Sequence, residues 1–149
     1  MTAVSKVMTR GVRTLTPSDT LAQAARVMEE LNVGVIPVCE GEKLVGVVTD
    51  RDIVVRGLAR ALDANSTQLK QVMSTEVRCA TEEQDLDQVL KTMANAQIRR
   101  MPVVDAKQRL VGIVSIGDIA AKDRHNDADL AESLGDISAP STGKTRGNA

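Results

Sequence analysis

The sequence predicts a mixed α/β (α+β) fold in which one strand-helix-strand-strand-helix unit occurs twice. The main observation is an internal repeat, because residues 7–38 recur at 72–103 with every match displaced by 65 residues. A second observation is that helical apolar spacing and short β-branched runs follow one another in the same order in both copies. A unit of roughly 50 residues buries little apolar surface alone, so the two copies are expected to pack together.

The two copies align residue by residue. The identical pairs are Val7/Val72, Met8/Met73, Val12/Val77, Arg13/Arg78, Thr16/Thr81, Leu21/Leu86, Gln23/Gln88, Met28/Met93, Pro37/Pro102 and Val38/Val103. After one inserted residue, in a predicted turn where insertions are tolerated, the displacement becomes 66, so that 44–53 corresponds to 110–119. Copies that keep polar residues at matching places predict two sites as well as two cores.

The first elements of each copy are a short strand, at 12–15 and 77–80, and then a helix. Apolar residues at spacings of three and four indicate the helix: Leu21, Ala24, Ala25, Met28 and Leu31 in the first copy, and Leu86, Val89, Leu90 and Met93 in the second. The polar segments 16–19 and 81–84 are expected to cap the two helices at their N-termini.

Two further strands and a closing helix complete each copy. Runs rich in β-branched residues predict strands at 33–38, 44–48, 98–104 and 110–114. The closing helix is expected to begin near Asp50 and Ile116. The predicted organisation is a first module at 1–60, a linker at 61–68, a second module at 69–124 and a flexible tail at 125–149.

The composition restricts the class of function. Nineteen basic and twenty acidic residues give a net charge of −1, which does not favour nucleic acid or an anionic membrane as a partner. The absence of Phe, Tyr and Trp excludes single-stranded nucleic-acid binding by aromatic stacking. Apolar runs are shorter than the ~20 residues of a membrane span and no signal peptide is recognisable, so we expect a cytoplasmic protein. Cys39 and Cys79 are expected to be reduced thiols.

A polar motif recurs at the end of the last strand of each copy. Segments 46–52 and 112–118 share the order Gly, two apolar residues, a hydroxyl, two variable residues and Asp. The unpaired N–H groups of a helix start favour phosphate, and a carboxylate three residues after the hydroxyl can accept from both vicinal hydroxyls of a ribose. The alternative is that hydroxyl and Asp only cap the helix. Recurrence in both copies favours a site.

Residues 4–122 resemble a tandem pair of CBS (cystathionine-β-synthase) modules. The resemblance rests on the recurring Gly-to-Asp motif, the strand ending in Pro-Val and the opening Val-Met-Thr/Ser, each present twice and in the same order. The short chain with Thr-Asp-Arg-Asp-Ile-Val at 49–54 is similar to stand-alone bacterial CBS proteins of the hypoxic or stress-response type. The resemblance implies a pseudo-twofold pair with two clefts between the modules, and a homodimer that forms a disc of four modules.

The resemblance also implies ligands and site residues. Each cleft can hold AMP, ADP, ATP or S-adenosylmethionine as a regulatory ligand rather than a tightly bound cofactor. Carried over by position, Asp52 and Asp118 bind ribose, Thr49 and Ser115 bind ribose or phosphate, Thr16 and Thr81 line the same clefts, and the backbone around Ile36-Pro37 and Met101-Pro102 holds adenine.

Charge differs between the copies at these positions. Arg99-Arg100 corresponds to Gly34-Val35, and Arg51 corresponds to Gly117. If these arginines face the clefts, one site prefers phosphate more strongly than the other; the alternative is that they are simply solvated.

The resulting functional hypothesis is a regulatory sensor in which an adenosyl ligand changes the geometry between the modules and thereby contact with a protein partner. The alternative is a CBS-pair interaction or dimerisation protein of the stress response that binds no nucleotide. No catalytic Ser–His–Asp set or Cys–His pair is recognisable, which argues against an enzyme. The single histidine, His125, has no companions at metal-ligand spacing, so no metal is expected.

Overall fold

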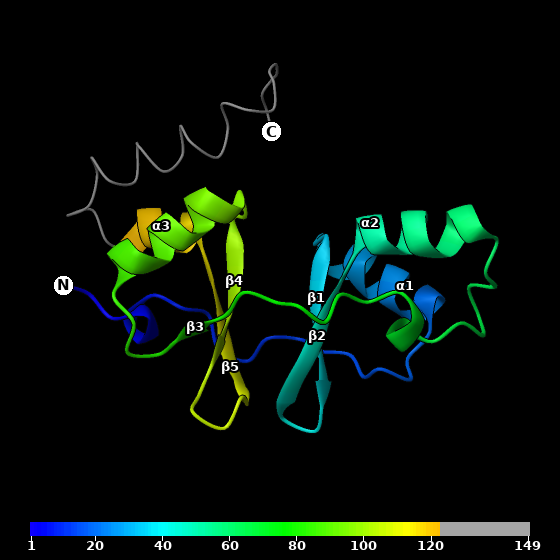
Figure 1. The fold of residues 1–149 in the computed structure, drawn as a ribbon, viewed down its shortest axis with the longest axis horizontal. Helices are drawn as coiled ribbons and strands as arrows, with labels where there is room; N and C mark the ends of the chain where they lie inside the picture. The colour runs from blue at the N-terminus through cyan, green and yellow to red at the C-terminus, as the bar shows by residue number, and fades with distance from the viewer. Residues whose placement is uncertain (123–149) are drawn as a thin grey trace, which may run out of the picture. The chain divides into compact units, whose positions relative to one another are not determined.

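The computed structural model describes residues 1–122, and it forms two compact units (Figure 1). Unit 1 contains Met1–Gly11, Cys79–Ala106 and the described residues from Val111 on. Unit 2 contains Val12–Arg78 and Lys107–Leu110. The predicted tail at 125–149 and His125 lie outside the described residues. No helix within residues 1–122 has the length and apolar character needed to cross a membrane.

Unit 2 is built on an antiparallel hairpin in which Val35 lies opposite Thr49. Its elements in chain order are α1 (Leu21–Leu31), β1 (Val35–Glu40), β2 (Lys43–Thr49), α2 (Asp50–Asp52), the π-helical turn η2 (Ile53–Gly57) and the 3₁₀ turns η3 (Leu58–Arg60) and η4 (Leu69–Gln71). The segments α2, η2 and η3 follow one another without a break. Figure 1 shows them beside α1, next to the hairpin.

Unit 1 is built on a three-stranded sheet in which β4 lies between β3 and β5, and β3 is parallel to β4. Its elements are the 3₁₀ turn η1 (Val4–Lys6), β3 (Ala80–Thr81), α3 (Leu86–Ala96), β4 (Arg100–Val104), β5 (Leu110–Ser115) and α4 (Ile116–Lys122). Both units thus combine helices with a small sheet, which confirms the predicted fold class.

The apolar faces of α1 and α3 form much of the two cores. All four apolar residues predicted for the face of α3 are buried. In α1 the buried residues are Leu21, Ala24, Val27 and Met28. The prediction was wrong for Ala25, which is exposed, and for Leu31, which is 44% exposed. The buried stripe of α1 passes through Val27, so Ala25 and Leu31 lie outside it.

The segments predicted to cap the helices end one residue before the observed N-caps, Thr20 and Asp85. The N-cap of α1 is Thr20, whose N–H donates to Gln23 Oε1 at 2.7 Å. The predicted segment 16–19 forms the preceding turn, in which the Thr16 N–H donates to Asp19 Oδ2 at 2.8 Å. A matching turn precedes α3, where the Thr81 N–H donates to Gln84 Oε1 at 3.2 Å. The polar segments therefore redirect the chain from sheet to helix.

The first predicted strand of each copy is shorter than expected. In unit 2 only Leu15 is paired: its N–H donates to Pro37 O at 3.0 Å, and its carbonyl accepts from the Cys39 N–H at 2.8 Å. In unit 1 the pairing extends to the two residues of β3. The turn that begins at Thr16 draws the chain away from β1, which ends the pairing at Leu15.

The opening segment of each sequence repeat completes the core that contains the strands of the other repeat. Thr9 exchanges two backbone hydrogen bonds with Ile113, of 2.8 and 2.9 Å, within unit 1. Ser74 exchanges two with Val47, both of 2.9 Å, within unit 2. The compact units therefore differ from the modules at 1–60 and 69–124: residues 1–11 belong to unit 1, and residues 69–78 belong to unit 2. Pairing between distant segments causes this difference.

The glycine that begins each polar motif makes this pairing possible. A Cβ atom at residue 46 would lie 2.6 Å from the carbonyl oxygen of Ser74. A Cβ atom at residue 112 would lie 2.7 Å from the carbonyl oxygen of Thr9. Only glycine allows backbone segments to approach this closely without displacement. The motif glycine of one repeat is therefore in direct contact with the Met-Thr/Ser opening of the other repeat.

Candidate functional site

The recurring hydroxyl and aspartate form the same reciprocal pair in both units. In unit 2 the Thr49 N–H donates to Asp52 Oδ2 and the Asp52 N–H donates to Thr49 Oγ1, both at 3.0 Å. In unit 1 the Ser115 N–H donates to Asp118 Oδ2 at 3.1 Å and the Asp118 N–H donates to Ser115 Oγ at 3.0 Å. Both pairs are capping boxes. The other carboxylate oxygen, Oδ1, takes no part in either box.

Asp52 has an additional neighbour that the sequence did not suggest. Asp52 is buried, with 8% of its surface exposed, and its Oδ1 lies 3.9 Å from Nε of Arg56. The same guanidinium donates from Nη1 to the carbonyl oxygen of Val72 at 3.3 Å. Arg56 therefore connects the motif to the segment that follows η4. The i,i+4 spacing of Asp52 and Arg56 was the available signal.

The start of the neighbouring strand lies beside each motif. The Asp50 N–H donates to the Gly34 carbonyl at 3.0 Å, and the Ile116 N–H donates to the Arg99 carbonyl at 3.0 Å. This contact places the Gly34-Val35 backbone next to the motif of unit 2. It places Arg99-Arg100 next to the motif of unit 1. Arg51, Arg99 and Arg100 are all exposed.

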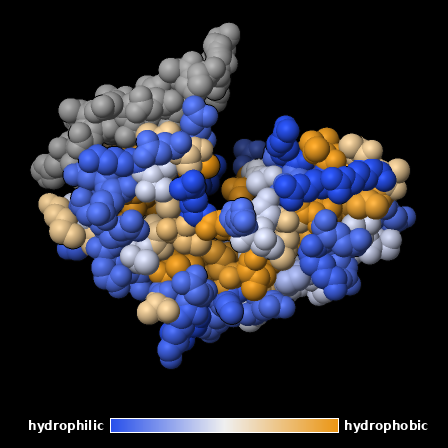
Figure 2. All heavy atoms as spheres, in the orientation of Figure 1, coloured by the Kyte–Doolittle hydropathy of each residue, from blue (hydrophilic) through white to orange (hydrophobic). Residues whose placement is uncertain are grey.

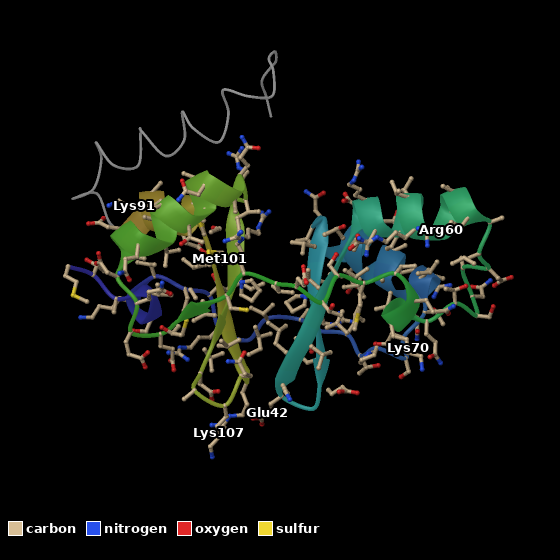
Figure 3. The ribbon with its side chains drawn as sticks, viewed as in Figure 1. Glu42, Arg60, Lys70, Lys91, Met101 and Lys107 are labelled. Carbon is tan, nitrogen blue, oxygen red and sulfur yellow. The ribbon has the colours of Figure 1, made fainter. Side chains whose placement is uncertain are left out.

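The residues predicted to surround adenine lie further along the same strands. Ile36 and Met101 are 1% and 2% exposed, and both belong to the hydrophobic cores. Figure 3 labels Met101 on β4. Pro37 and Pro102 are buried as well. The side chains of Ile36 and Met101 thus serve packing, and the adenine contact assigned to the backbone here stays a prediction.

Within its own unit, neither Thr16 nor Thr81 lies beside the motif, and their predicted place in a cleft stays a prediction. Thr16 follows Leu15, which pairs with Val38, whereas Thr49 pairs with Val35 at the other end of β1. From Val35 to Cys39, the neighbour expected for Thr16, the strand spans about 13 Å at about 3.3 Å per residue. Thr81 likewise pairs with Val104, at the end of β4 away from Arg100. The parallel direction of the first strand, which the sequence did not reveal, causes this separation.

The described residues contain no group of three or more His, Cys, Asp and Glu side chains that could hold a metal ion. Cys39 is buried, and Cys79 is partly buried. Burial raises the pKa of both thiols above the ordinary value, which favours the protonated, weakly nucleophilic form.

Comparison with known proteins gives a family for this arrangement. The family model described as the CBS domain matches twice, at residues 4–58 and 69–124. The chain belongs to the CBS-domain family. The two matches coincide with the two sequence repeats, which confirms the predicted resemblance. Each CBS domain therefore contains one hydroxyl-aspartate pair.

Stand-alone CBS proteins are among the relatives. The CBS domain-containing protein YhcV of Bacillus subtilis is 41% identical over 86% of this chain and 90% of its own length. Hypoxic response protein 1 of Mycobacterium tuberculosis is 36% identical over 80% of this chain and 84% of its own.

Solved structures share the fold. A crystal structure of Hypoxic Response Protein I with two coordinated zinc ions has a TM-score of 0.73, with 36% identity over 81% of this chain and 98% of that one. CBSX2, solved in complex with AMP, has a TM-score of 0.73 at 23% identity and covers 85% of this chain and 99% of its own. The second likeness shows a shared fold alone.

Proposed function

We propose that this CBS protein is a regulatory sensor of adenosyl ligands, a class that includes AMP, ADP, ATP and S-adenosylmethionine. The observation that carries the proposal is the hydroxyl-aspartate pair that recurs with the same geometry in both units. The Oδ1 atoms of Asp52 and Asp118 are outside the capping boxes, so they can accept from ribose hydroxyls. The AMP bound by CBSX2, a protein of the same fold, fits this ligand class.

Capping alone does not account for an aspartate at both places. The capping boxes at α1 and η4 in the same chain use glutamine, as Gln23 and Gln71. A neutral amide therefore suffices for a cap in this protein. The charged carboxylate at residues 52 and 118 supports a further role in ligand binding.

Regulation requires that the ligand distinguishes between arrangements of the chain. A ligand that binds one arrangement more tightly shifts the population toward it, by no more than the difference in its binding free energies. We propose that this shift alters contact with a protein partner, and that the chain itself catalyses no reaction.

The test compares carboxylate and amide at the two positions. We expect Asp52→Asn and Asp118→Asn each to weaken one binding event for an adenosyl ligand by about tenfold or more, since a hydrogen bond to a charged group contributes about 1.5–3 kcal/mol. Titration calorimetry with AMP, ATP and S-adenosylmethionine gives the affinities. Gln23→Ala is the control, because it breaks the α1 capping box and leaves both motifs intact. Unchanged affinity in both asparagine variants would refute the site assignment.

A second candidate function is supported by the capping geometry itself. If both aspartates act only as caps, the chain is an interaction protein without a nucleotide. No adenosyl ligand would then shift the melting temperature of the wild type. The absence of aromatic residues offers a direct check, since nucleotide that co-purifies with the protein would dominate its absorbance at 260 nm.

We also propose that the chain forms a homodimer through an exposed apolar surface on unit 2. Figure 2 shows hydrophobic atoms at the surface of unit 2. The exposed side chains are Leu31, Val54, Val55 and Leu58, of which Leu58 is 71% exposed. The second repeat has Ala96, Ala120, Ala121 and Arg124 at these positions, so this apolar character is specific to the first repeat. A second copy offers the same surface, as a twofold interface requires.

Sedimentation of Leu58→Arg, the residue that the second repeat carries there, tests the homodimer. We expect the wild type to dimerise and the variant to be monomeric, since the side chain is too exposed for its replacement to unfold the chain. A wild type that stays monomeric at high concentration would refute the interface.

A further inference from the structure

We propose that the two motifs select adenosyl ligands of different charge, with Asp50 as the residue that determines the preference of unit 2. Unit 1 takes a ligand that carries 5′-phosphates. Unit 2 takes one whose 5′ substituent is neutral or cationic. The inference rests on the proposed adenosyl-ligand function and adds the ligand class of each unit.

The same backbone contact occurs at both places, so we look for a difference in selectivity in the side chains. The bonds from Asp50 N–H to the Gly34 carbonyl and from Ile116 N–H to the Arg99 carbonyl are both 3.0 Å long. Gly34 and Arg99 are aligned in the repeat, and so are Asp50 and Ile116. The two contacts are therefore a matched pair within one chain.

In unit 2 a carboxylate lies against the start of the strand. A Cβ atom at residue 34 would lie 3.0 Å from Asp50 Oδ2 and 3.3 Å from its Cγ. The absence of a side chain at Gly34 thus leaves space that the Asp50 carboxylate borders. Asp50 Oδ1 also accepts from the Arg51 N–H at 2.8 Å, which holds the carboxylate in this orientation.

In unit 1 the same two positions carry an arginine and an apolar residue. Ile116 is 5% exposed and belongs to the core, so it contributes no charge. Arg99 and its neighbour Arg100 are exposed, and a carboxylate at the position of Asp50 is absent from this motif.

The charge of the aligned positions differs between the two units. In unit 2, Asp50 and Asp52 outweigh Arg51, which leaves −1; in unit 1, Arg99 and Arg100 outweigh Asp118, which leaves +1. Arg56, which lies beside Asp52, has a basic counterpart in the sequence, Lys122, and does not alter this difference. A terminal phosphate is therefore less favourable near Asp50 than near Arg99.

The test measures a ratio of affinities, ATP against adenosine, at one motif at a time. Asp118→Ala disables the motif of unit 1. In that background we expect Asp50→Asn to raise the affinity for ATP relative to adenosine by at least about threefold, and the gain should shrink in 0.5 M salt, roughly as screening predicts. Glu40→Gln is the matched control, because it removes one exposed negative charge at the far end of β1.

The complementary variant addresses unit 1. In an Asp52→Ala background, Arg99→Gly should lower the same ratio. An unchanged ratio in Asp50→Asn, or an equal change in Glu40→Gln, would overturn the charge selection while leaving adenosyl binding in place. If none of adenosine, AMP, ADP, ATP and S-adenosylmethionine binds the wild type, the proposed function fails, and this inference fails with it.

Discussion

A hydroxyl and a carboxylate three residues apart close the first turn of α2 and of α4. The four N–H···O distances of the two pairs lie between 3.0 and 3.1 Å. This near identity means that both carboxylates are held in the same hydrogen-bonded arrangement without a ligand. A carboxylate oriented in advance loses little side-chain entropy on binding. At the scale of single residues, capping and ligand binding are thus compatible tasks for one side chain.

We expect Thr49→Val to lower the free energy of unfolding by about 1 kcal/mol, because valine keeps the shape of threonine and loses the cap acceptor. Ser115→Ala should have a similar effect in unit 1. Urea titration followed by circular dichroism measures both. A cost near zero in both variants would show that the capping boxes add no stability.

The two thiols make a pH-dependent contribution to stability. Burial raises the pKa of Cys39 and of Cys79 from 9.0. The folded chain therefore holds these protons more tightly than the unfolded chain. The stabilising effect is fully present below the unfolded pKa and is lost as pH rises through the folded pKa. The Cys39→Ala, Cys79→Ala double variant should lose less stability than the wild type between pH 8 and pH 10. An equal loss would contradict this assignment.

At the scale of elements, the glycine before each motif sets how closely a second segment can approach the strand. Gly46 lies on β2 and Gly112 lies on β5, each facing a backbone carbonyl from a distant part of the chain. A backbone oxygen cannot move aside as a flexible side chain can. The close approach of the second segment therefore depends on the absence of a side chain at this glycine.

Gly112→Ala should destabilise unit 1 by about 1–3 kcal/mol, the usual cost of overpacking, because its Cβ would lie 2.7 Å from the Thr9 oxygen. Gly117→Ala is the matched control. Its Cβ would lie 3.6 Å from Ser115 Oγ, an ordinary contact, and the first repeat carries Arg51 there. Thermal unfolding of both variants checks the difference. Equal melting temperatures would argue against the close approach.

At the scale of the whole molecule, each sequence repeat supplies the opening segment of the other unit. Val4 and Val7 are buried in the core of unit 1, and Leu69 and Val72 are buried in the core of unit 2. Neither repeat therefore contains a complete core. Each core therefore contains buried residues from both sequence repeats.

This exchange predicts which fragment folds. Residues 12–78 contain the whole buried cluster of unit 2, whereas residues 1–65 lack Leu69 and Val72. We expect the fragment 12–78 to unfold cooperatively in urea and the fragment 1–65 to show no cooperative transition, since losing two large buried side chains costs several kcal/mol, roughly the stability of so small a unit. Cooperative unfolding of 1–65 alone would contradict the exchange.

Local chemistry in the sequence was sufficient for much of the fold. The helical spacing of Leu86, Val89, Leu90 and Met93 predicted the buried face of α3, because helix periodicity acts within a few turns. The pairing of Thr49 with Asp52 followed from a spacing of three residues, which also lies within one turn. Errors occurred where position depended on a partner: Leu31 was predicted to be buried, and the segment 16–19 was predicted to cap a helix.

The sequence by itself determined the duplication, the order of the elements and the two matched motifs, because each of these is expressed in residues close together in the chain. Only the tertiary structure decided that the opening segments exchange, that Thr16 and Thr81 lie away from the motif of their own unit, and that Asp50 lies beside Gly34. These features depend on backbone pairing between segments far apart in the chain. Such pairing is selected by the packing of the whole core, which no short stretch of residues encodes.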